Sequence, residues 1–372
     1  MLTAMSFAAF PRTVTDVAGR TVTLPDKIEM VLAPGHCASI VGAFAAEKIP
    51  GGLVRGKASQ QFVPEVWWNT DTTQRGPGGP PPRAGSPPPK GAKGPGESGG
   101  SPGNDSLRMI RMKETILKNH VNILFQEMRS PKSIADADHM QRELGISVVL
   151  LDLTIPRYRE NFELLGNIFE KPQRTEALVS FVSKYLDVIE KQVKAIPLSE
   201  RVRVYYAENR DGLRTEPKGS AHTEALEFAG GINVAALPAG ASLEKSVEVT
   251  VNDVQKMTPD LILVATPGSE NLEAYSHLLL DSAWKKVPAV KKGKVYQIPA
   301  QPFSWFDRPP GANRMIGIVW LAQLLYPERF PYDMVAVTQE FFQVFYEFSL
   351  SKEQAKALLV TQPAPRYSVK KK

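Results

Sequence analysis

A long amphipathic helix constrains the fold of this chain more than any other feature of its sequence. Apolar residues recur at steps of three and four from Leu178 to Ile196, which places them on one face of a helix. Pro172 stands at a first-turn position and Pro197 ends the pattern. About 25 helical residues span roughly 37 Å at 1.5 Å each, comparable to the diameter of a small domain. We therefore expect a rigid strut between two parts of the chain.

Strands and helices alternate on both sides of this strut. Before it, the predicted strands and helices lie at residues 30–33, 114–118, 121–125, 133–144 and 146–153. After it, they lie at 202–207, 221–229, 251–257, 261–265, 271–280 and 294–298, with closing helices at 312–325, 332–348 and 352–359. Such alternation is typical of parallel sheets covered by helices, so the predicted fold class is α/β.

The length of the chain favours two domains, because 372 residues exceed the ~250 to 300 at which a single core stops growing. The predicted boundaries are an N-terminal lobe at 11–170 that starts with a hairpin at 13–24, the strut at 171–197, and a C-terminal lobe at 198–372. With 42% hydrophobic residues the chain has enough apolar side chains for two cores.

A tract at residues 76–103 interrupts the N-terminal lobe. It holds 10 glycines and 9 prolines, 19 of its 28 residues, and no large apolar side chain. Such a segment cannot bury enough surface to offset its ordering entropy, so we predict disorder there. It could also be a polyproline ligand of a partner, which would make the chain an interaction protein, or an insertion or reading-frame error.

Charge and cysteine content exclude several functions. The net charge is +6, but no basic stripe with interleaved aromatic residues indicates nucleic-acid binding, and an anionic ligand fits better. Cys37 is the only cysteine, so neither an intramolecular disulfide nor a cysteine zinc site can form, and a buried inert thiol is expected. No HxxxH or HxH pair encodes a multi-histidine site for a free metal.

The first ten residues are apolar and rich in small side chains. They are typical of the last part of a secretory signal peptide that lacks its charged start, and Ser6-Phe7-Ala8 could be the cleavage site. The other reading is a leader peptide of no significance. No lipobox cysteine is present, and a periplasmic location is expected.

Several segments resemble the periplasmic substrate-binding proteins of ABC transporters, of the iron-siderophore and cobalamin type with a helical backbone (cluster A). They are TDVAGRTVTLPDKIEMVLAPG, ETILKNHVNILF, LGISVVLLD, GGINVA, VTVNDVQKMTPDLILV and WLAQLLYPERF. The resemblance covers most of the chain outside residues 56–110. It implies two Rossmann-like lobes with central parallel sheets, joined by one long interdomain helix, with a ligand cleft between the lobes and slight closure on binding.

The resemblance also implies two acids that dock to arginines of the membrane permease. Each acid opens a helix that runs into an apolar strand, and the matching positions here are Glu114 and Asp253. The alternative is that both acids complement the dipole at a helix N-terminus. The sequence departs from the family pattern at His120-Val121, where Pro-Asp is usual. It departs again at the Pro/Gly tract, which stands where the family has the segment leading to Glu114, close to the cleft wall of the N-terminal lobe.

Ligand contacts are expected from loops after strand ends, because α/β sheets bind ligands there. The loops are 34–36, 209–223 and 301–314, and the candidate ligand-binding residues are His36, Arg210, Arg214, His222, Trp305, Phe306 and Arg308. Guanidinium groups suit anionic chelates, and either histidine could complete the coordination of a bound metal, although surface or capping roles are open for both. Trp305 and Phe306 could instead anchor the closing helices.

The predicted function is that of an extracytoplasmic substrate-binding protein that captures an iron-siderophore or related metal complex. Haem, corrinoids and other metal chelates are alternatives, and so is an enzyme acting on a chelate. No Walker loop, GxSxG, GxGxxG or paired carboxylate motif supports an enzyme, and Asp307 beside Arg308 reads as an ordinary ion pair. We expect a monomer without an intrinsic cofactor, with iron carried inside the ligand, and an ABC permease and ATPase complex as partners.

Overall fold

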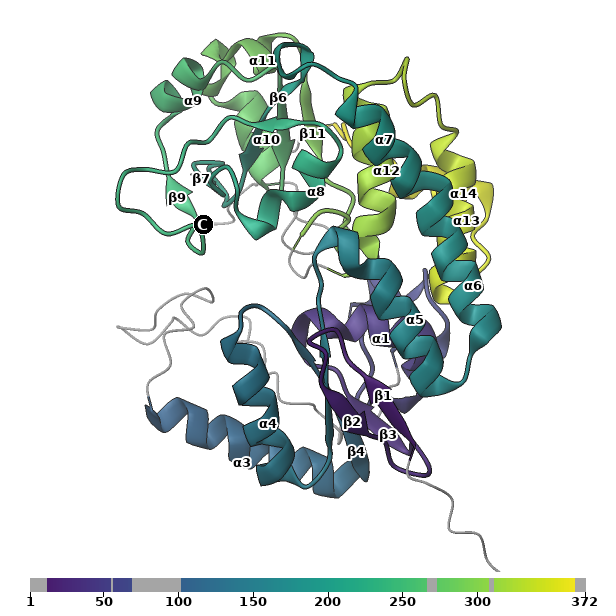
Figure 1. The fold of residues 1–372 in the computed structure, drawn as a ribbon. Helices are drawn as coiled ribbons and strands as arrows, with labels where there is room; N and C mark the ends of the chain where they lie inside the picture. The colour runs from purple at the N-terminus through teal and green to yellow at the C-terminus, as the bar shows by residue number, and fades with distance from the viewer. Residues whose placement is uncertain (1–11, 55, 69–101, 266–272, 308–310, 365–372) are drawn as a thin grey trace, which may run out of the picture.

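The protein forms two α/β lobes joined along one side by helices (Figure 1). The computed structural model describes residues 12–54, 56–68, 102–265, 273–307 and 311–364, and for 102–108 only the helical backbone. The predicted fold class and the two sheets are confirmed. In Figure 1 the N-terminal lobe is purple to blue, the C-terminal lobe is green, and the joining helices α6, α7 and α12 to α14 lie on the right.

The N-terminal lobe is built on a three-stranded parallel sheet in the order β3 (Met30–Leu32), β4 (Val121–Glu127) and β5 (Ser147–Leu151). Alternate residues of the strands enter separate cores, as the pleat requires. One face packs on α1 (Ala38–Ala45) and α5 (Tyr158–Phe169), and the other on α3 (Pro102–Asn119) and α4 (Lys132–Leu144). Both faces are therefore covered.

Two smaller elements complete this lobe. The predicted hairpin is present as β1 (Thr13–Thr15) and β2 (Thr21–Thr23), paired antiparallel. Asp16 fixes its turn, because its carboxylate accepts hydrogen bonds from the backbone N–H groups of Ala18 and Arg20. The short helix α2 (Lys57–Gln60) follows α1 in the chain.

The C-terminal lobe repeats the design with a four-stranded parallel sheet. Its order is β11 (Val295–Gln297), β10 (Leu261–Val264), β6 (Arg203–Ala207) and β8 (Ile232–Asn233). The helices of this lobe are α8 (Glu224–Phe228), α9 (Val251–Met257), α10 (Glu273–Leu280) and α11 (Pro288–Lys291). A two-residue antiparallel ribbon, β7 (Arg214–Thr215) with β9 (Val247–Glu248), lies beside the sheet.

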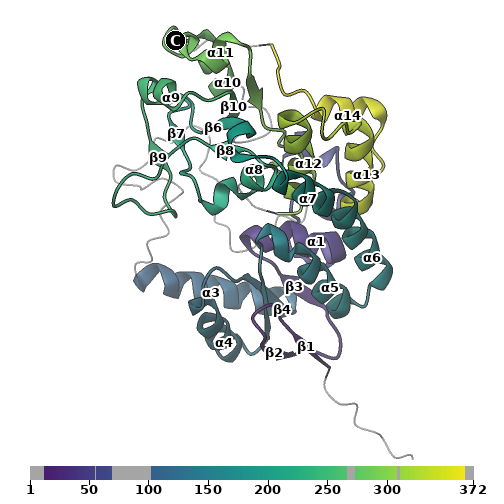
Figure 2. The same cartoon turned by 45° about the horizontal axis from the view of Figure 1, so that its top comes forward.

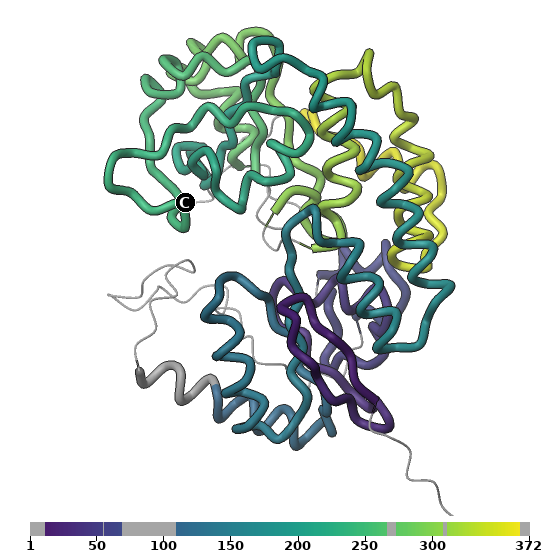
Figure 3. Tube along the Cα trace, viewed as in Figure 1, coloured from purple at the N-terminus to yellow at the C-terminus, as the bar shows by residue number. Residues whose placement is uncertain are grey.

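The predicted strut is a continuous helix from residue 172 to 194. It comprises α6 (Pro172–Phe181), a π-helical segment (Val182–Asp187) and α7 (Val188–Lys194). The Cα trace in Figure 3 shows that this helix lies beside both lobes. Its apolar face is buried as the periodicity predicted, whereas nothing in the pattern indicated the wider π turn.

Three C-terminal helices complete this side of the molecule (Figure 2): α12 (Asn313–Leu325) and α13 (Met334–Tyr346) pack on the strut, and α14 (Lys352–Leu358) packs on α13. Phe181 of the strut packs on Phe341 and Phe345 of α13, with ring centroids 5.7 and 5.3 Å apart. The Tyr185 hydroxyl donates to Glu340 at 2.7 Å. These contacts belong to one apolar core that includes residues of both sheets.

Two sequence predictions need correction. Helix α3 begins at Pro102, so the last two residues of the tract predicted to be disordered are helical. Proline and glycine are tolerated there because the first turn has no intrahelical N–H bonds to lose. Glu114 consequently lies well inside α3 and does not open it. Residues 76–101 and the leader at 1–10 lie outside the described part of the chain.

Helix α5, between β5 and the strut, was not predicted. Among the described residues, no helix is both long and apolar enough to span a bilayer.

Removing Arg174 tests the joint between the lobes. Its guanidinium donates to the backbone carbonyls of Ala43 in α1 at 2.6 Å and Phe345 in α13 at 3.0 Å. We expect Arg174→Ala to lower the free energy of unfolding by about 2 to 4 kcal/mol, because two partly buried acceptors lose a charged donor. Urea denaturation measures it, with exposed Lys191→Ala on the same strut as the control. Equal effects of both substitutions would contradict this role.

Candidate functional site

A histidine and a glutamate meet at the carboxyl edge of the N-terminal sheet. His36 follows β3, and Glu127 is the last residue of β4, so neighbouring parallel strands bring both to one edge. Gly35 permits the sharp turn, since its φ is +60°. His36 Nδ1 lies 2.7 Å from Glu127 Oε2, and the two side chains remain 24% and 21% exposed. The carboxylate therefore fixes the orientation of the ring.

Arg129 adds a cation to this pair. Its guanidinium lies 2.8 Å from Glu127 Oε2 and is 64% exposed. Its Nη2 is also 3.0 Å from His36 Nδ1, but a ring nitrogen that donates to the carboxylate cannot accept from the arginine. Glu127 is thus the shared acceptor. Burial alone would raise the pKa of Glu127, but the hydrogen bonds and charges of His36 and Arg129 outweigh it and lower the pKa.

The C-terminal lobe holds a second pair of the same kind. His222 lies in a 3₁₀ turn (Ala221–Thr223) capped by Ser220, whose Oγ accepts the His222 N–H. His222 Nδ1 lies 2.6 Å from Asp307 Oδ2, with the histidine 26% exposed and the aspartate fully buried. Each lobe therefore presents an imidazole that is about a quarter exposed and is held by a carboxylate at its Nδ1.

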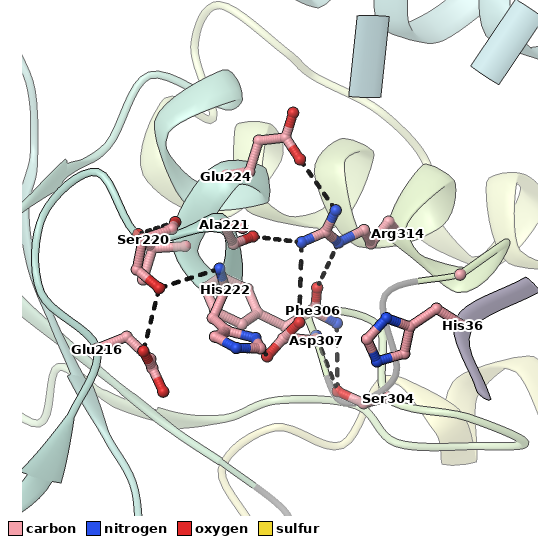
Figure 4. A network of polar contacts seen from close by, with 12 residues as sticks. His36, Glu216, Ser220, Ala221, His222, Glu224, Ser304, Phe306, Asp307 and Arg314 are labelled. Atoms are coloured by element: carbon pink, nitrogen blue, oxygen red, sulfur yellow. Dashed lines mark hydrogen bonds and ion pairs between the residues drawn. The ribbon is translucent and has the colours of Figure 1, made fainter. Parts of the chain in front are cut away.

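Arg314 of α12 lies behind this second pair and is only 3% exposed (Figure 4). It donates to the carbonyls of Ala221 at 2.6 Å and Phe306 at 3.3 Å, and its Nη1 lies 3.0 Å from Glu224 Oε2. Glu224 also accepts the backbone N–H of Ile155 from the other lobe, at 2.9 Å. Burial is the largest influence on Glu224 and raises its pKa despite these partners.

Further hydrogen bonds hold the two lobes together near His36. The backbone N–H of Ala312 donates to Ser39 Oγ at 3.0 Å, and the Tyr158 hydroxyl donates to the Gly311 carbonyl at 3.2 Å. Gly311 is required here, because a Cβ atom would come within 2.2 Å of Ser39 Oγ. In the view of Figure 4, His36 and His222 lie on either side of Asp307. The junction of the lobes thus collects both histidine pairs.

The predicted aromatic surface is wrong. Trp305 and Phe306 are 0% exposed, so neither can offer a face to a ligand. Trp305 Nε1 donates to the Gln301 carbonyl at 2.9 Å, and Phe306 packs on Tyr206 with ring centroids 4.7 Å apart. The Trp305 carbonyl lies where a Cβ atom of Gly317 in α12 would be. Both aromatic residues anchor the closing helices, which was the alternative interpretation.

The predicted arginines have partners in their own lobe. Arg210 is 83% exposed and lies 3.0 Å from Glu273, while Arg214 in β7 donates to Ser246. Arg214 also lies 3.9 Å from the buried Glu208. Arg308 lies outside the described residues. Asp307 pairs with His222 at 2.6 Å, and its predicted pair with Arg308 stays a prediction.

The two predicted docking acids differ in their surroundings. Glu114 is exposed on α3 between Ile110 and Leu117, which are 52% and 77% exposed. Asp253 forms a capping box with Thr250, accepting the Thr250 N–H while its own N–H donates to Thr250 Oγ1. The Thr250 hydroxyl, which donates to the Asp253 carboxylate at 2.6 Å, and the Thr250 N–H lower the pKa of Asp253. The helix-capping alternative therefore applies to Asp253 and not to Glu114, and docking itself stays a prediction.

Sequence reasoning missed Glu127, Arg129 and Glu224. Glu127 could have been found, because it stands two residues after the apolar run that ends at Phe125, in the strand next to the one that leads to His36. Across the described residues, no group of three or more His, Cys, Asp or Glu side chains is arranged to hold a metal ion. Cys37 is fully buried, and burial raises its thiol pKa, in agreement with the inert role predicted.

Comparison with known proteins connects this geometry to binding proteins. The model of a family described as periplasmic binding protein matches residues 114–302. The molybdate-binding protein MolA of Haemophilus influenzae is 30% identical over 198 residues, which are 53% of this chain and 54% of MolA. The matched region thus spans about half the length of that relative.

Solved structures match over nearly the whole chain. An ABC transporter solute binding protein from Sulfurospirillum deleyianum has a TM-score of 0.75 and 25% identity, covering 94% of this chain and 99% of that one. MolA of Haemophilus influenzae bound to molybdate has a TM-score of 0.60 and 22% identity, covering 91% of this chain and 99% of that one. The second match supports the fold alone.

The lowered pKa of Glu127 predicts a pH-dependent contribution to stability. A carboxyl whose pKa is lower in the folded state stabilises the protein above its unfolded pKa, near 4.5, and loses this as the pH falls through the folded value. We expect Glu127→Gln to cost about 1 to 2 kcal/mol of unfolding free energy near pH 7 and much less near pH 3. Urea unfolding at both pH values measures it. Exposed Glu29→Gln is the control, and a loss independent of pH would contradict this origin.

Proposed function

The chain belongs to the periplasmic binding protein family, and we propose that it is the substrate-binding component of an ABC importer that captures a compact anionic metal species between its lobes. The observation that carries this proposal is the pair of partly exposed histidines, His36 and His222, one from each lobe. Each has Nδ1 against a carboxylate, at 2.7 and 2.6 Å. Carboxylates in this position orient an imidazole and increase its basicity.

Molybdate is the first ligand to consider. Arg129 presents an exposed guanidinium beside His36, and a cation with imidazole donors suits a small oxyanion. The name of the relative with 30% identity points the same way, since it is a molybdate-binding protein.

A ferric chelate with open coordination positions is the second candidate. Histidine held by a carboxylate is the usual arrangement of metal-binding histidines, so His36 and His222 suit an incompletely wrapped iron. In both cases the metal is cargo within the ligand and not a resident cofactor. We propose binding and delivery as the role of the chain, without catalysis.

Calorimetric titration with sodium molybdate and with a ferric tetradentate catecholate tests the proposal, with sulfate for comparison. We expect one of the two metal species to bind, and His36→Ala and His222→Ala each to weaken binding about tenfold or more, ~1.4 kcal/mol. His139→Ala, an exposed histidine on α4, is the matched control and should change nothing. If neither species binds, or if all three substitutions weaken binding equally, the proposed site is wrong.

Delivery to the permease is proposed to use Glu114 and Asp253. The helices α3 and α9 that carry them lie on the side of the molecule away from the strut, one on each lobe (Figure 1). Two separated acids can each pair with a basic group of the permease. Such contacts at two points orient the binding protein on its partner more than they raise the affinity.

Charge reversal separates docking from binding. We expect Glu114→Lys to lower ligand uptake into vesicles that contain the cognate permease and ATPase complex by about tenfold, with ligand affinity unchanged. Thr250→Ala removes the capping box of α9 but keeps Asp253, so it controls for helix capping when compared with Asp253→Lys. Uptake at the wild-type rate by both charge-reversal variants would refute docking through these acids.

A further inference from the structure

We propose that Arg314 is a positioning residue that couples His222 to the contact between the two lobes. The proposal rests on the proposed function, because His222 is one of its two ligand-binding histidines. Arg314 does not itself reach a ligand, since its side chain is only 3% exposed. It acts through the backbone and side chains that it binds.

The guanidinium of Arg314 binds the residues directly before both members of the pair. Ala221 precedes His222 and Phe306 precedes Asp307, and Arg314 binds both carbonyls, at 2.6 and 3.3 Å. Its Nη2 is also 3.8 Å from Asp307 Oδ1. One buried side chain therefore fixes the distance between two loops that are far apart in sequence. Any shift of Arg314 moves His222 relative to Asp307.

The other side of Arg314 leads to the N-terminal lobe. Glu224 uses one oxygen for Arg314, at 3.0 Å, and the other for the backbone N–H of Ile155, at 2.9 Å. Ile155 begins the 3₁₀ turn (Ile155–Arg157) that leads into α5. Movement of one lobe against the other must stretch this bond or pull Glu224 and Arg314 with it. Lobe position and His222 geometry are thus linked through two side chains.

A purely fold-stabilising ion pair is the competing explanation. A buried cation needs its acceptors in either case, so a drop in thermal stability does not separate the two. The orientation of the His222 ring does separate them, because only positioning requires it to respond to changes at Glu224. Glu224→Gln keeps the side-chain shape and an acceptor for Ile155, whereas Glu224→Ala removes both. Comparing the two variants separates the effect of losing the negative charge of Glu224 from the effect of losing its hydrogen bond to Ile155.

The test uses the full chain with Glu224→Ala, Glu224→Gln and Arg314→Lys. Asp187→Asn is the matched control, because Asp187 of the strut pairs with Arg159 of α5 at 2.7 Å. Without ligand, NMR records hydrogen exchange of the Ile155 amide and the ring-nitrogen signals of His222. We expect Glu224→Ala to speed that exchange about tenfold or more and to shift the His222 signals, with partial rescue by Glu224→Gln and no change in the control.

Sodium molybdate and the ferric catecholate then serve as probes of binding. We expect Glu224→Ala and Arg314→Lys to weaken binding of the species that the wild type takes up about tenfold, and Glu224→Ala to add little in a His222→Ala background. Unchanged His222 signals in Glu224→Ala, despite faster exchange at Ile155, would overturn the coupling. If the wild type binds neither probe, the proposed function fails, while the measurements without ligand still decide the coupling. If Arg314→Lys does not fold, the two Glu224 variants decide it.

Discussion

Packing of one long helix against both lobes is the constraint on which the rest of this structure depends. The apolar face of the strut joins α12 and α13 in a core that takes in Phe125 of one sheet and Tyr206 of the other. Opening the lobes widely would expose this core to water. Exposing ~400 Å² of apolar surface costs about 10 kcal/mol at ~25 cal/mol per Å². That is comparable to the whole stability of a typical domain, so this packing disfavours wide opening of the lobes.

A frame of this stiffness holds the proposed binding side chains in place before a ligand arrives. His36 and His222 each stand on a turn after or beside a sheet, with a carboxylate that already fixes the ring. Little side-chain entropy is then left to lose on binding, which favours affinity from a small number of contacts. The polar bonds at Ser39, Tyr158 and Glu224 cross the junction in the same region. Small lobe movements are therefore felt first at the histidines.

Features that depend on apolar periodicity and on strand ends could be predicted from the sequence, whereas features that depend on tertiary contacts could not. The strut and both sheets followed from apolar spacing, and His36 and His222 were selected because they lie in loops expected after strands. The spacing of Trp305 and Phe306 cannot tell a ligand surface from a buried anchor, because aromatic residues serve both. Asp307 pairs with a histidine 85 residues earlier in the chain, and no local pattern reveals such a partner. Helix α3 was predicted too short because glycine and proline dominate the segment before it.

The charges of the described network distinguish the two candidate ligands by proton linkage. Around the two histidines, Arg129 and Arg314 contribute two cationic side chains, while Glu127, Asp307 and Glu224 contribute three carboxyl groups. On the proposed function, an oxyanion is held best by imidazolium donors, so its binding favours proton uptake. Iron bound through imidazole needs neutral rings and releases any proton they carry. The number of protons taken up on binding can be obtained from binding enthalpies in buffers of different ionisation enthalpy. This number is expected to be positive for the oxyanion and negative for the iron chelate.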